Sequence, residues 1–339
     1  MRAIKILFLL IIILFTCSCS KDEIDTKPAI SESKGIFICG IGWENGKVVP
    51  RLWINSNIYN YENNGNGGIA NDMAFLGSEI YTVGWIYNTD GSFKTHVVWK
   101  NSKILTELTN TGFPVPFAIA TNENNNDIYV VGLEQQPGEW AKAKIWKNGI
   151  KSSISTTDGA MPFDIEIRNN IVYIVGCIPQ SNIDIAVVWK NGIPTFLTDG
   201  THDAVATSLT IINDDIYVAG KEKSSNGNYI AKYWKNGEAT NLTDGTFDAL
   251  TTTIVVKNNI VYVAGSEYNT NGKQVAKYWK NGVQKILSDG IEHSKITSLA
   301  ISNNTIYSIG YNYLNANLWI GDNIQLSNYN NYFSSIIVR

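Results

Sequence analysis

Two kinds of side chain in this sequence could act on a ligand: a pair of carboxylates and a few tryptophans that interrupt a regular spacing. Asp72 and Asp164 stand at matching points of two similar segments, and paired carboxylates can bind a cation or divide acid and base roles. Trp43 and Trp140 lie outside the regular positions, and exposed aromatic planes stack on sugar rings or anchor protein partners. These residues are candidates for ligand recognition or acid–base chemistry; the alternatives are a solvated channel lining for the two acids and local packing under a loop for the two tryptophans.

The histidines add further candidates but no metal site. His202, with its neighbour Asp203, and His293 lie in two loops of one class, "DGTHDA" and "DGIEHS". A zinc site needs three or four converging ligands, and the Asp-Gly turns lack the alternating acids of a calcium loop, so we predict no metal and no cofactor. No catalytic set is predicted, and the candidate ligand-binding residues are Trp43, Trp140, His202, Asp203, His293 and Asp164.

A repeat of about 45 residues must position these side chains. Each unit carries a run such as "IYVAG", and the closing glycines are spaced by 44, 48, 44, 44, 45 and 45 residues. Those glycines are Gly40, Gly84, Gly132, Gly176, Gly220, Gly265 and Gly310. One tryptophan follows in each unit: Trp53, Trp99, Trp146, Trp189, Trp234, Trp279 and Trp319.

Every unit offers four short runs rich in β-branched and aromatic residues, bounded by Gly, Asn or Asp. The "KNG" that follows the tryptophan predicts a hairpin, since both central residues of a type I′ turn need positive φ. A period near 45 residues with four strands per unit is typical of a β-propeller blade. The fold class predicted is therefore all-β, a seven-bladed propeller over residues 35–339.

The two ends of the chain predict how the ring closes. The first unit begins at its second strand, "GIFICG", with no inner strand before it. The tail "YFSSIIVR" at 332–339 matches the inner-strand runs of other units, such as "ALTTTIVV". We therefore expect the C-terminal strand to complete the first blade and remove the open edges.

Propeller geometry then assigns roles to the aromatic residues. The seven regularly spaced tryptophans are interpreted as packing residues between blades, with the following lysine on an outward face. Short "KNG" and "KNN" turns share one face, and the longer, more varied loops share the other, which we expect to be the binding face. Trp43 and Trp140 fall in long loops of the first and third units.

The first residues predict an exported, lipidated protein. "MRAIKILFLLIIILFTCSCS" has a basic start and an apolar run too short to span a membrane. It resembles a bacterial lipoprotein signal over residues 1–18, which implies lipid attachment at Cys19, with Cys17 as the rival, and a tether over 19–34. "SKDE" at 20–23 resembles the tag that directs lipoproteins of Bacteroidota-type bacteria to the cell surface. We expect an outer-membrane protein, lipid-anchored at the cell surface.

Cys39 and Cys177 are the two cysteines of the predicted propeller. They fall in equivalent strands of the first and fourth blades, nearly opposite across the channel. Because a disulfide needs Cα atoms within about 7 Å, we predict two buried thiols.

Composition excludes some partners and activities. The formal net charge is −3 and only four arginines occur, which argues against nucleic acid and against a sialidase-type arginine cluster. No Gly-x-Ser-x-Gly elbow is present. The repeats resemble those of Bacteroidota-type surface lipoproteins whose propellers carry Trp-Lys-Asn-Gly motifs. That resemblance implies the fold and an envelope location and carries no activity with it.

Two classes of function remain. The first is a monomeric recognition module whose long-loop face binds a glycan or an envelope protein, with membrane contact through the lipid alone. The alternative is a polysaccharide lyase or glycosidase that uses Asp72, Asp164 or a loop histidine.

Overall fold

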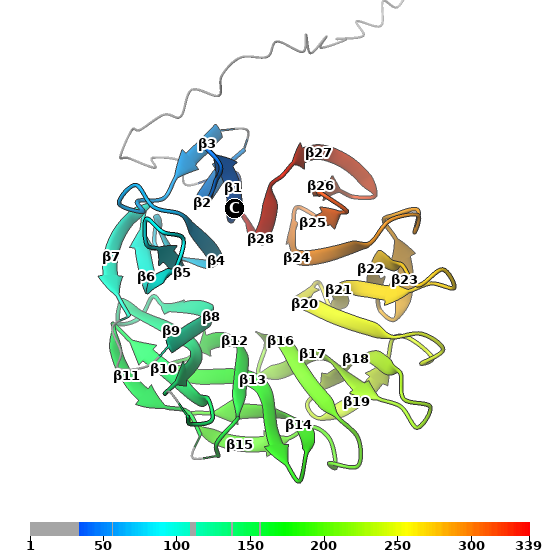
Figure 1. Cartoon of the computed structure of the whole chain (residues 1–339). Helices are drawn as coiled ribbons and strands as arrows, with labels where there is room; N and C mark the ends of the chain where they lie inside the picture. The colour runs from blue at the N-terminus through cyan, green and yellow to red at the C-terminus, as the bar shows by residue number, and fades with distance from the viewer. Residues whose placement is uncertain (1–33, 56, 109–112, 137, 156) are drawn as a thin grey trace, which may run out of the picture.

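The computed structural model describes residues 34–339, except 56, 109–112, 137 and 156. They form seven four-stranded antiparallel sheets, the blades, arranged around a central channel (Figure 1). This confirms the predicted seven-bladed propeller. No helix in this part of the chain is long and apolar enough to cross a membrane. The predicted signal segment, with Cys17 and Cys19, lies outside the described residues.

Within each blade the strands run from the channel to the outer edge in the order in which they are paired. From blade 1 to blade 7 they are β28 (Tyr332–Val338), β1 (Ile36–Glu44), β2 (Lys47–Ile54), β3 (Asn57–Asn60); β4 (Gly68–Leu76), β5 (Glu79–Tyr87), β6 (Phe93–Lys100), β7 (Lys103–Glu107); β8 (Phe113–Asn122), β9 (Asp127–Gln135), β10 (Lys142–Lys147), β11 (Ile150–Ser153); β12 (Met161–Arg168), β13 (Ile171–Gln180), β14 (Ile183–Lys190), β15 (Ile193–Phe196); β16 (Ala204–Ile212), β17 (Asp215–Lys223), β18 (Tyr229–Lys235), β19 (Glu238–Asn241); β20 (Ala249–Lys257), β21 (Ile260–Tyr268), β22 (Gln274–Lys280), β23 (Val283–Ile286); β24 (Ser294–Ser302), β25 (Thr305–Asn312), β26 (Asn315–Ile320), β27 (Asn323–Tyr329).

Blade 1 is assembled from both ends of the chain, as the sequence predicted. β28 pairs antiparallel with β1, with Ile36 opposite Val338. Beyond the strand ends, the backbone N–H of Gly35 donates to Arg339 O and that of Arg339 donates to Gly35 O, both at 3.0 Å. The C-terminal strand therefore closes the ring, because it pairs with the edge of β1 that faces the channel.

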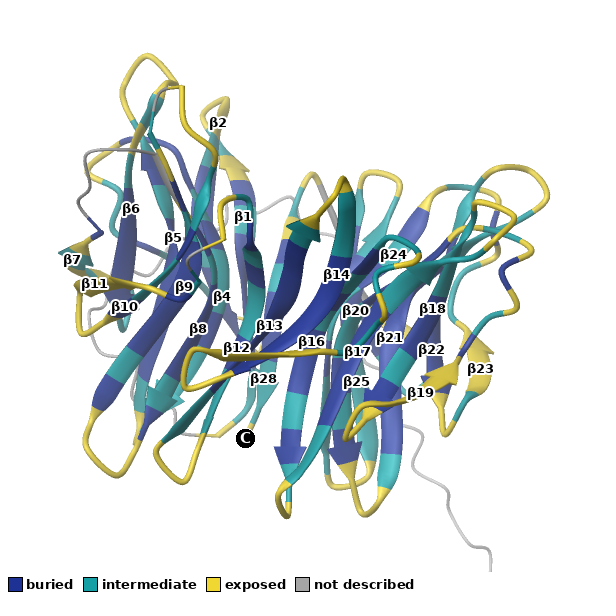
Figure 2. Cartoon of the chain, turned by 90° about the horizontal axis from the view of Figure 1, so that it is seen from below, coloured by how far each residue is buried: buried dark blue, intermediate teal, exposed yellow. Residues whose placement is uncertain are grey.

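The core lies between neighbouring blades. The seven regularly spaced tryptophans are each at most 2% exposed. Trp234 of blade 5, for example, packs in one cluster with Tyr173 and Val188 of blade 4. Figure 2 shows burial concentrated along the strands, with exposure in the turns and outer strands. The tryptophans are packing residues, as predicted.

The Lys-Asn-Gly that follows the tryptophan also behaves as predicted. In four blades with this motif, and in blade 2 where the sequence is Lys-Asn-Ser, the lysine ammonium group lies 5.2–5.8 Å from the ring centre of a tyrosine in the same blade, a cation–π distance. The turn residues Asn236 and Gly237 both have positive φ, at 51° and 89°. The motif therefore ends one strand, begins the next and covers the outer surface of the blade.

Cys39 and Cys177 are both buried and free, as predicted. Burial raises the pKa of the Cys177 thiol to about 12. Both side chains are protonated packing residues at neutral pH.

The repeated glycine has a specific structural role. Gly265 faces β20, where a β-bulge leaves Thr252 without a pairing partner between Thr251 and Thr253. A Cβ at Gly265 would collide with the backbone carbonyl oxygen of Leu250, and the six other repeat glycines meet the inner strand in the same way. Only glycine fits because the bulge brings the inner backbone against the second strand.

Candidate functional site

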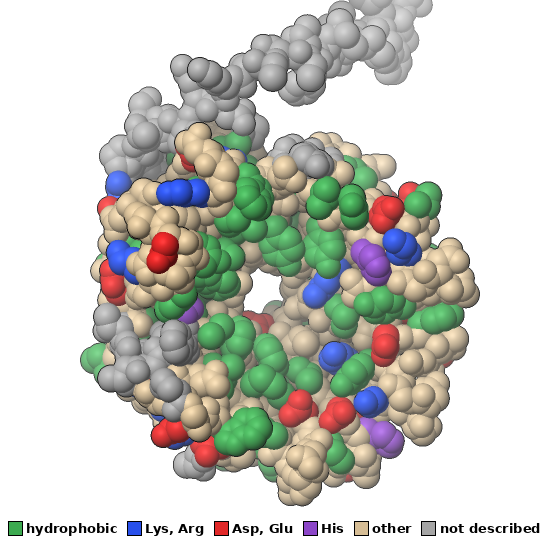
Figure 3. Space-filling view, in the orientation of Figure 1, with side chains coloured by type: hydrophobic (Ala, Val, Ile, Leu, Met, Phe, Trp, Pro, Cys, Tyr) green, Lys and Arg blue, Asp and Glu red, His purple; other side chains and the backbone are tan. Residues whose placement is uncertain are grey.

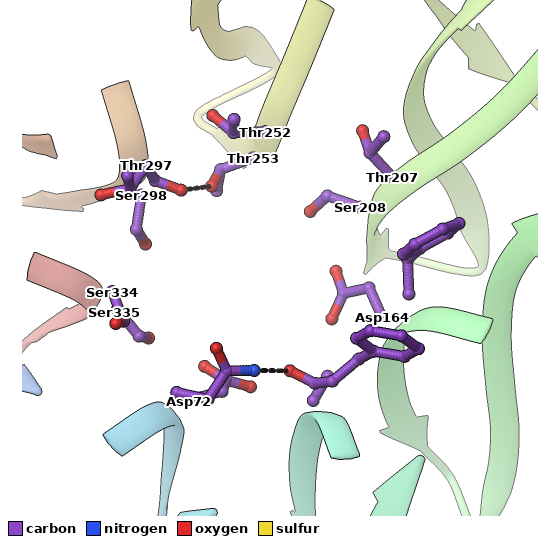
Figure 4. Close-up of a pocket in the computed structure, with 14 residues that line it drawn as sticks. Asp72, Asp164, Thr207, Ser208, Thr252, Thr253, Thr297, Ser298, Ser334 and Ser335 are labelled. Carbon is purple, nitrogen blue, oxygen red and sulfur yellow. Dashed lines mark hydrogen bonds between the residues drawn. The ribbon is translucent and has the colours of Figure 1, made fainter. Parts of the chain in front are cut away.

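A ring of seven β-bulges lines the channel. Each inner strand shifts its register once, so two consecutive residues per blade point toward the channel. Together they enclose a polar pocket of about 280 Å³ (Figure 4). The lining residues are Asn71, Asp72, Phe117, Ala118, Phe163, Asp164, Thr207, Ser208, Thr252, Thr253, Thr297, Ser298, Ser334 and Ser335.

The two carboxylates of this pocket join neighbouring blades. Asp72 accepts a hydrogen bond from the backbone N–H of Ile119 in blade 3, at 3.0 Å. Asp164 accepts one from the backbone N–H of Leu209 in blade 5, at 2.9 Å. These bonds lie where adjacent inner strands share no sheet pairing. They give both predicted acids a structural role in holding the blades together.

Burial dominates the titration of both acids. Desolvation raises the pKa of Asp72, and it raises the pKa of Asp164 to about 7, helped by the negative charge of Asp72. The hydrogen bond from Leu209 N–H opposes this effect because it stabilises the carboxylate. Asp164 therefore keeps its proton to a far higher pH in the folded protein than in the unfolded chain.

We expect Asp164→Asn to change how stability depends on pH. The folded wild type holds the Asp164 proton up to about pH 7, whereas the unfolded chain releases it near 3.8. The wild type therefore loses free energy of unfolding as pH rises through this window, by roughly 4 kcal/mol in all and roughly 3 kcal/mol between pH 5 and pH 8, and the variant does not.

Urea denaturation of both proteins at pH 5 and pH 8 measures the difference. Glu166, whose pKa burial also raises to about 7, titrates in both proteins and so cancels. The variant should gain stability relative to wild type as pH rises. Stability curves that stay parallel would show that Asp164 is ionised throughout.

Trp43 lines a different pocket, at the seam between blades 7 and 1. This pocket, called here the seam pocket, has a volume of about 420 Å³ and is formed by Ile41, Trp43, Tyr311, Tyr313, Leu314, Asn330, Asn331 and Tyr332. Trp43 is 51% exposed and lies near the end of β1, in the strand and not in the loop that the sequence predicted. The rings of Tyr311 and Tyr332 lie 5.7 Å apart at an interplanar angle of 34°.

Short connections leave this pocket open. Between β27 and β28 the chain has only Asn330 and Asn331, whereas residues 197–203, 242–248 and 287–293 make the corresponding connections in three other blades. Likewise Tyr313 and Leu314 alone join β25 to β26, whereas residues 224–228 and 269–273 join the equivalent strands of blades 5 and 6. Both connections of blade 7 at the seam therefore have two residues, the length that also joins β1 to β2 in blade 1 and β13 to β14 in blade 4.

Tyr313 is held in an unfavourable conformation in this pocket. Its φ is +54°, a value that bulky residues rarely adopt, and its side chain is 64% exposed. Strained backbone of this kind is concentrated at binding and catalytic sites, where the surrounding structure maintains it. The two-residue turn between the paired Asn312 and Asn315 holds Tyr313 in this conformation, with its ring exposed at the rim of the seam pocket.

The other tryptophans outside the repeat behave differently from Trp43. Trp140 is 75% exposed in the connection between β9 and β10, on blade 3. Trp85 is half-buried, and its indole N–H donates to the hydroxyl of Tyr87 at 3.1 Å, while its ring contacts His96 edge-on. The seam pocket contains Trp43 alone of the six predicted binding residues.

The predicted loop residues brace hairpins in separate blades. Asp203 accepts a hydrogen bond from Asp184 N–H at 3.2 Å, and His293 Nδ1 accepts one from Gln274 N–H at 3.2 Å. His202 is half-buried and its Nδ1 lies 3.0 Å from the hydroxyl of Thr201. The structure brings neither histidine into the seam pocket, and Asp164 lies in the channel. Among the described residues no group of three or more His, Cys, Asp or Glu side chains could hold a metal ion.

Sequence reasoning missed the tyrosines and asparagines of the seam pocket. A signal was present in the sequence: the last unit has shorter connections than the two units directly before it. The residues involved lie near opposite ends of the chain, so their contact depends on ring closure.

No family model matches the chain, and no curated protein matches it significantly. Solved structures do resemble it. An acylaminoacyl peptidase of Pyrococcus horikoshii is 14% identical, with 88% of this chain and 51% of that chain covered and a TM-score of 0.54. This chain therefore spans about half the length of the peptidase.

Two further structures are covered almost completely. The β-propeller domain of the Trilobed protease of Pyrococcus furiosus, described as having an open velcro topology, is 12% identical, with 88% and 96% covered and a TM-score of 0.51. The periplasmic gluconolactonase of Pseudomonas aeruginosa is 9% identical, with 90% and 99% covered and a TM-score of 0.51. At these identities the likeness concerns the propeller fold alone.

Proposed function

We propose that this protein is a recognition propeller that binds a glycan in the seam pocket. The observation that carries the proposal is the aromatic lining of that pocket: Trp43, Tyr313 and Tyr332 are 51%, 64% and 38% exposed. A sugar ring has apolar C–H faces and a rim of hydroxyls. Aromatic planes cover the faces, and the side-chain amides of Asn330 and Asn331 can bond the rim. The pocket volume of about 420 Å³ lies in the range of small-ligand sites.

A binding role fits the chemistry of the site better than hydrolysis. Among the described residues, the seam pocket is lined by aromatic, aliphatic and amide side chains, with no carboxylate to serve as acid or base. The two channel carboxylates are occupied by backbone N–H groups of neighbouring blades. Asp72 and Asp164, on which the glycan-cleaving alternative depends, lie in the channel and not in the seam pocket.

We propose further that the propeller is displayed on the outer membrane through a lipid on Cys19. This part of the proposal rests on the signal-like leader, the polar tether and the "SKDE" stretch. Cys19→Ala should abolish fatty-acid labelling and release the protein from membranes, whereas labelling that persists would move the lipid to Cys17. Protease treatment of intact cells tests surface display, because a protein that faces the periplasm is protected.

Trp43→Ala is expected to weaken glycan binding about thirtyfold, since losing a central anchor costs about 2 kcal/mol or more. The melting temperature should change little because the ring is half-exposed. Binding is measured by affinity electrophoresis and calorimetry with polysaccharides selected on a glycan array.

Phe196→Ala is the matched control for that experiment. Phe196 is 52% exposed, on the outer strand β15, so it matches Trp43 in exposure but lies away from the seam pocket. Trp140→Ala tests, by the same assay, whether the second tryptophan predicted to bind a ligand contributes to glycan binding. Equal losses for Trp43→Ala and Phe196→Ala, or an array without a binding glycan, would contradict the proposed function and favour a protein partner.

A further inference from the structure

A lysine stands beside the seam pocket where the repeat has apolar residues. Lys295 lies on β24, two residues before the bulged Thr297. The equivalent residues of the other blades are Ile69, Val115, Met161, Val205, Leu250 and Tyr332. Blade 7 therefore departs from the pattern by placing a positive charge at a position that carries a hydrophobic side chain, half-buried or exposed, in the six other blades.

Lys295 lies on the same side of its sheet as the pocket. It is directly opposite Tyr311 in the β24–β25 pairing. Side chains of directly opposed residues share one face of a sheet, with Cβ atoms about 5 Å apart. Tyr311 lines the seam pocket and its ring lies against Tyr332 of blade 1. Lys295 itself does not line the seam pocket, but it lies on the inner strand beside Tyr311, on the channel side of the pocket, within reach of a ligand bound against that ring.

The charge of Lys295 is not compensated within the described part of the chain. Its ammonium group has no ion pair and no hydrogen bond there, although its side chain is half-buried. Desolvation lowers its pKa, the neighbouring charge of Lys221 lowers it further, and no carboxylate acts against them. A desolvated charge without a partner is costly, so a position that keeps one is suited to an anionic ligand.

Lys221 provides the contrast. It also replaces an apolar residue near the channel and is partly buried, but its ammonium group lies 4.0 Å from the ring centre of Tyr229. The charges of Asp248 and Asp203 oppose the fall in its pKa. Figure 3 shows hydrophobic side chains around the central opening, with basic side chains beside it on the side of β20 and β24. Of the two lysines, Lys295 is the one whose charge lacks an internal counterpart.

We propose that the glycan bound in the seam pocket is acidic, a sugar ring with an anionic substituent that pairs with Lys295. This inference rests on the proposed function, because it names the class of sugar for the same pocket. The aromatic side chains bind the ring, and Lys295 provides the charge complement for a carboxylate or a sulfate ester. A general electrostatic attraction of the whole protein for polyanions would not explain a preference for acidic glycans, since the protein has a formal net charge of −3.

The test compares probes that differ only in charge. Polygalacturonate and its fully methyl-esterified form share one ring, and dextran sulfate and dextran form a second pair that separates sulfate from carboxylate. In at least one pair we expect the charged form to bind about tenfold more tightly, the scale of one hydrogen bond to a charged group. Lys295→Met should abolish that difference without weakening the neutral form, and Lys295→Arg should retain it.

Lys221→Met is the matched control, and it should change the preference less than threefold, since that charge already has acidic neighbours. Equal effects of the two methionine variants would overturn the inference by placing the anion over the channel. Wild-type protein that binds charged and neutral forms equally, with Trp43→Ala still weakening both, would refute the acidic ligand and leave the proposed function intact. Failure of every probe and every array glycan to bind would refute both.

Discussion

Removal of residues 332–339 is expected to leave the protein unfolded or aggregated. These residues form β28 and end at Arg339, and without them β1 has a free edge. Phe333 and Ile336 are 0% and 4% exposed, and each side chain contributes about 1.5–3 kcal/mol through burial. The truncation also removes a whole ladder of backbone hydrogen bonds. Because a domain is stable by only about 5–15 kcal/mol, these losses are enough to unfold it.

Size-exclusion chromatography and circular dichroism of the truncated chain measure this effect. A synthetic peptide of residues 331–339 supplies the control, since an extended peptide can add to an exposed sheet edge. Addition of the peptide should restore soluble, folded protein. A truncated chain that stays monomeric and melts like the parent would show that stability does not depend on ring closure.

Trp234→Ala is expected to cost about 3–5 kcal/mol of unfolding free energy, through the cavity it leaves. Trp234 is 1% exposed and packs in the cluster that joins blades 4 and 5. Its ring also lies against Gly220, where an added Cβ would meet it. The loss should therefore loosen the contact between two blades as well as the packing within one.

Trp140→Ala serves as the stability control because Trp140 is 75% exposed. It should change the free energy of unfolding by less than about 0.5 kcal/mol, the usual range for surface positions. Urea denaturation of both variants gives the comparison. A loss for Trp140→Ala as large as that for Trp234→Ala would mean that Trp140 is a packing residue.

The sequence alone predicted the blade, the number of blades and the closing strand. Each of these depends on short-range signals that recur every 45 residues or so. The Asn-Gly pair of 236–237 needs positive φ at both residues, and the structure has it. One tryptophan per unit fills the space between blades because a propeller presents the same gap seven times. The tail matched an inner strand because the first unit lacked one.

The bulges were not predictable in the same way. The unpaired residue is Asn71 in blade 2, Phe117 in blade 3 and Thr207 in blade 5, so no residue type marks the position. The repeat glycines that face the bulges were visible in the sequence. The need for glycine there comes from the close approach of the inner strand, which the sequence did not reveal. That approach depends on how the four strands pair, which a single strand does not encode.

The candidate site marks the limit of the sequence more sharply. By sequence Trp43 and Trp140 are alike, two tryptophans outside the repeat, and both are exposed. Ring closure places Tyr311, Tyr313 and Tyr332 in one pocket with Trp43. Trp140 does not line that pocket. The sequence determined the repeating scaffold, since local turn and packing preferences act within one unit. Only the tertiary structure decided which aromatic side chain belongs to a pocket, because that pocket forms where the last blade meets the first.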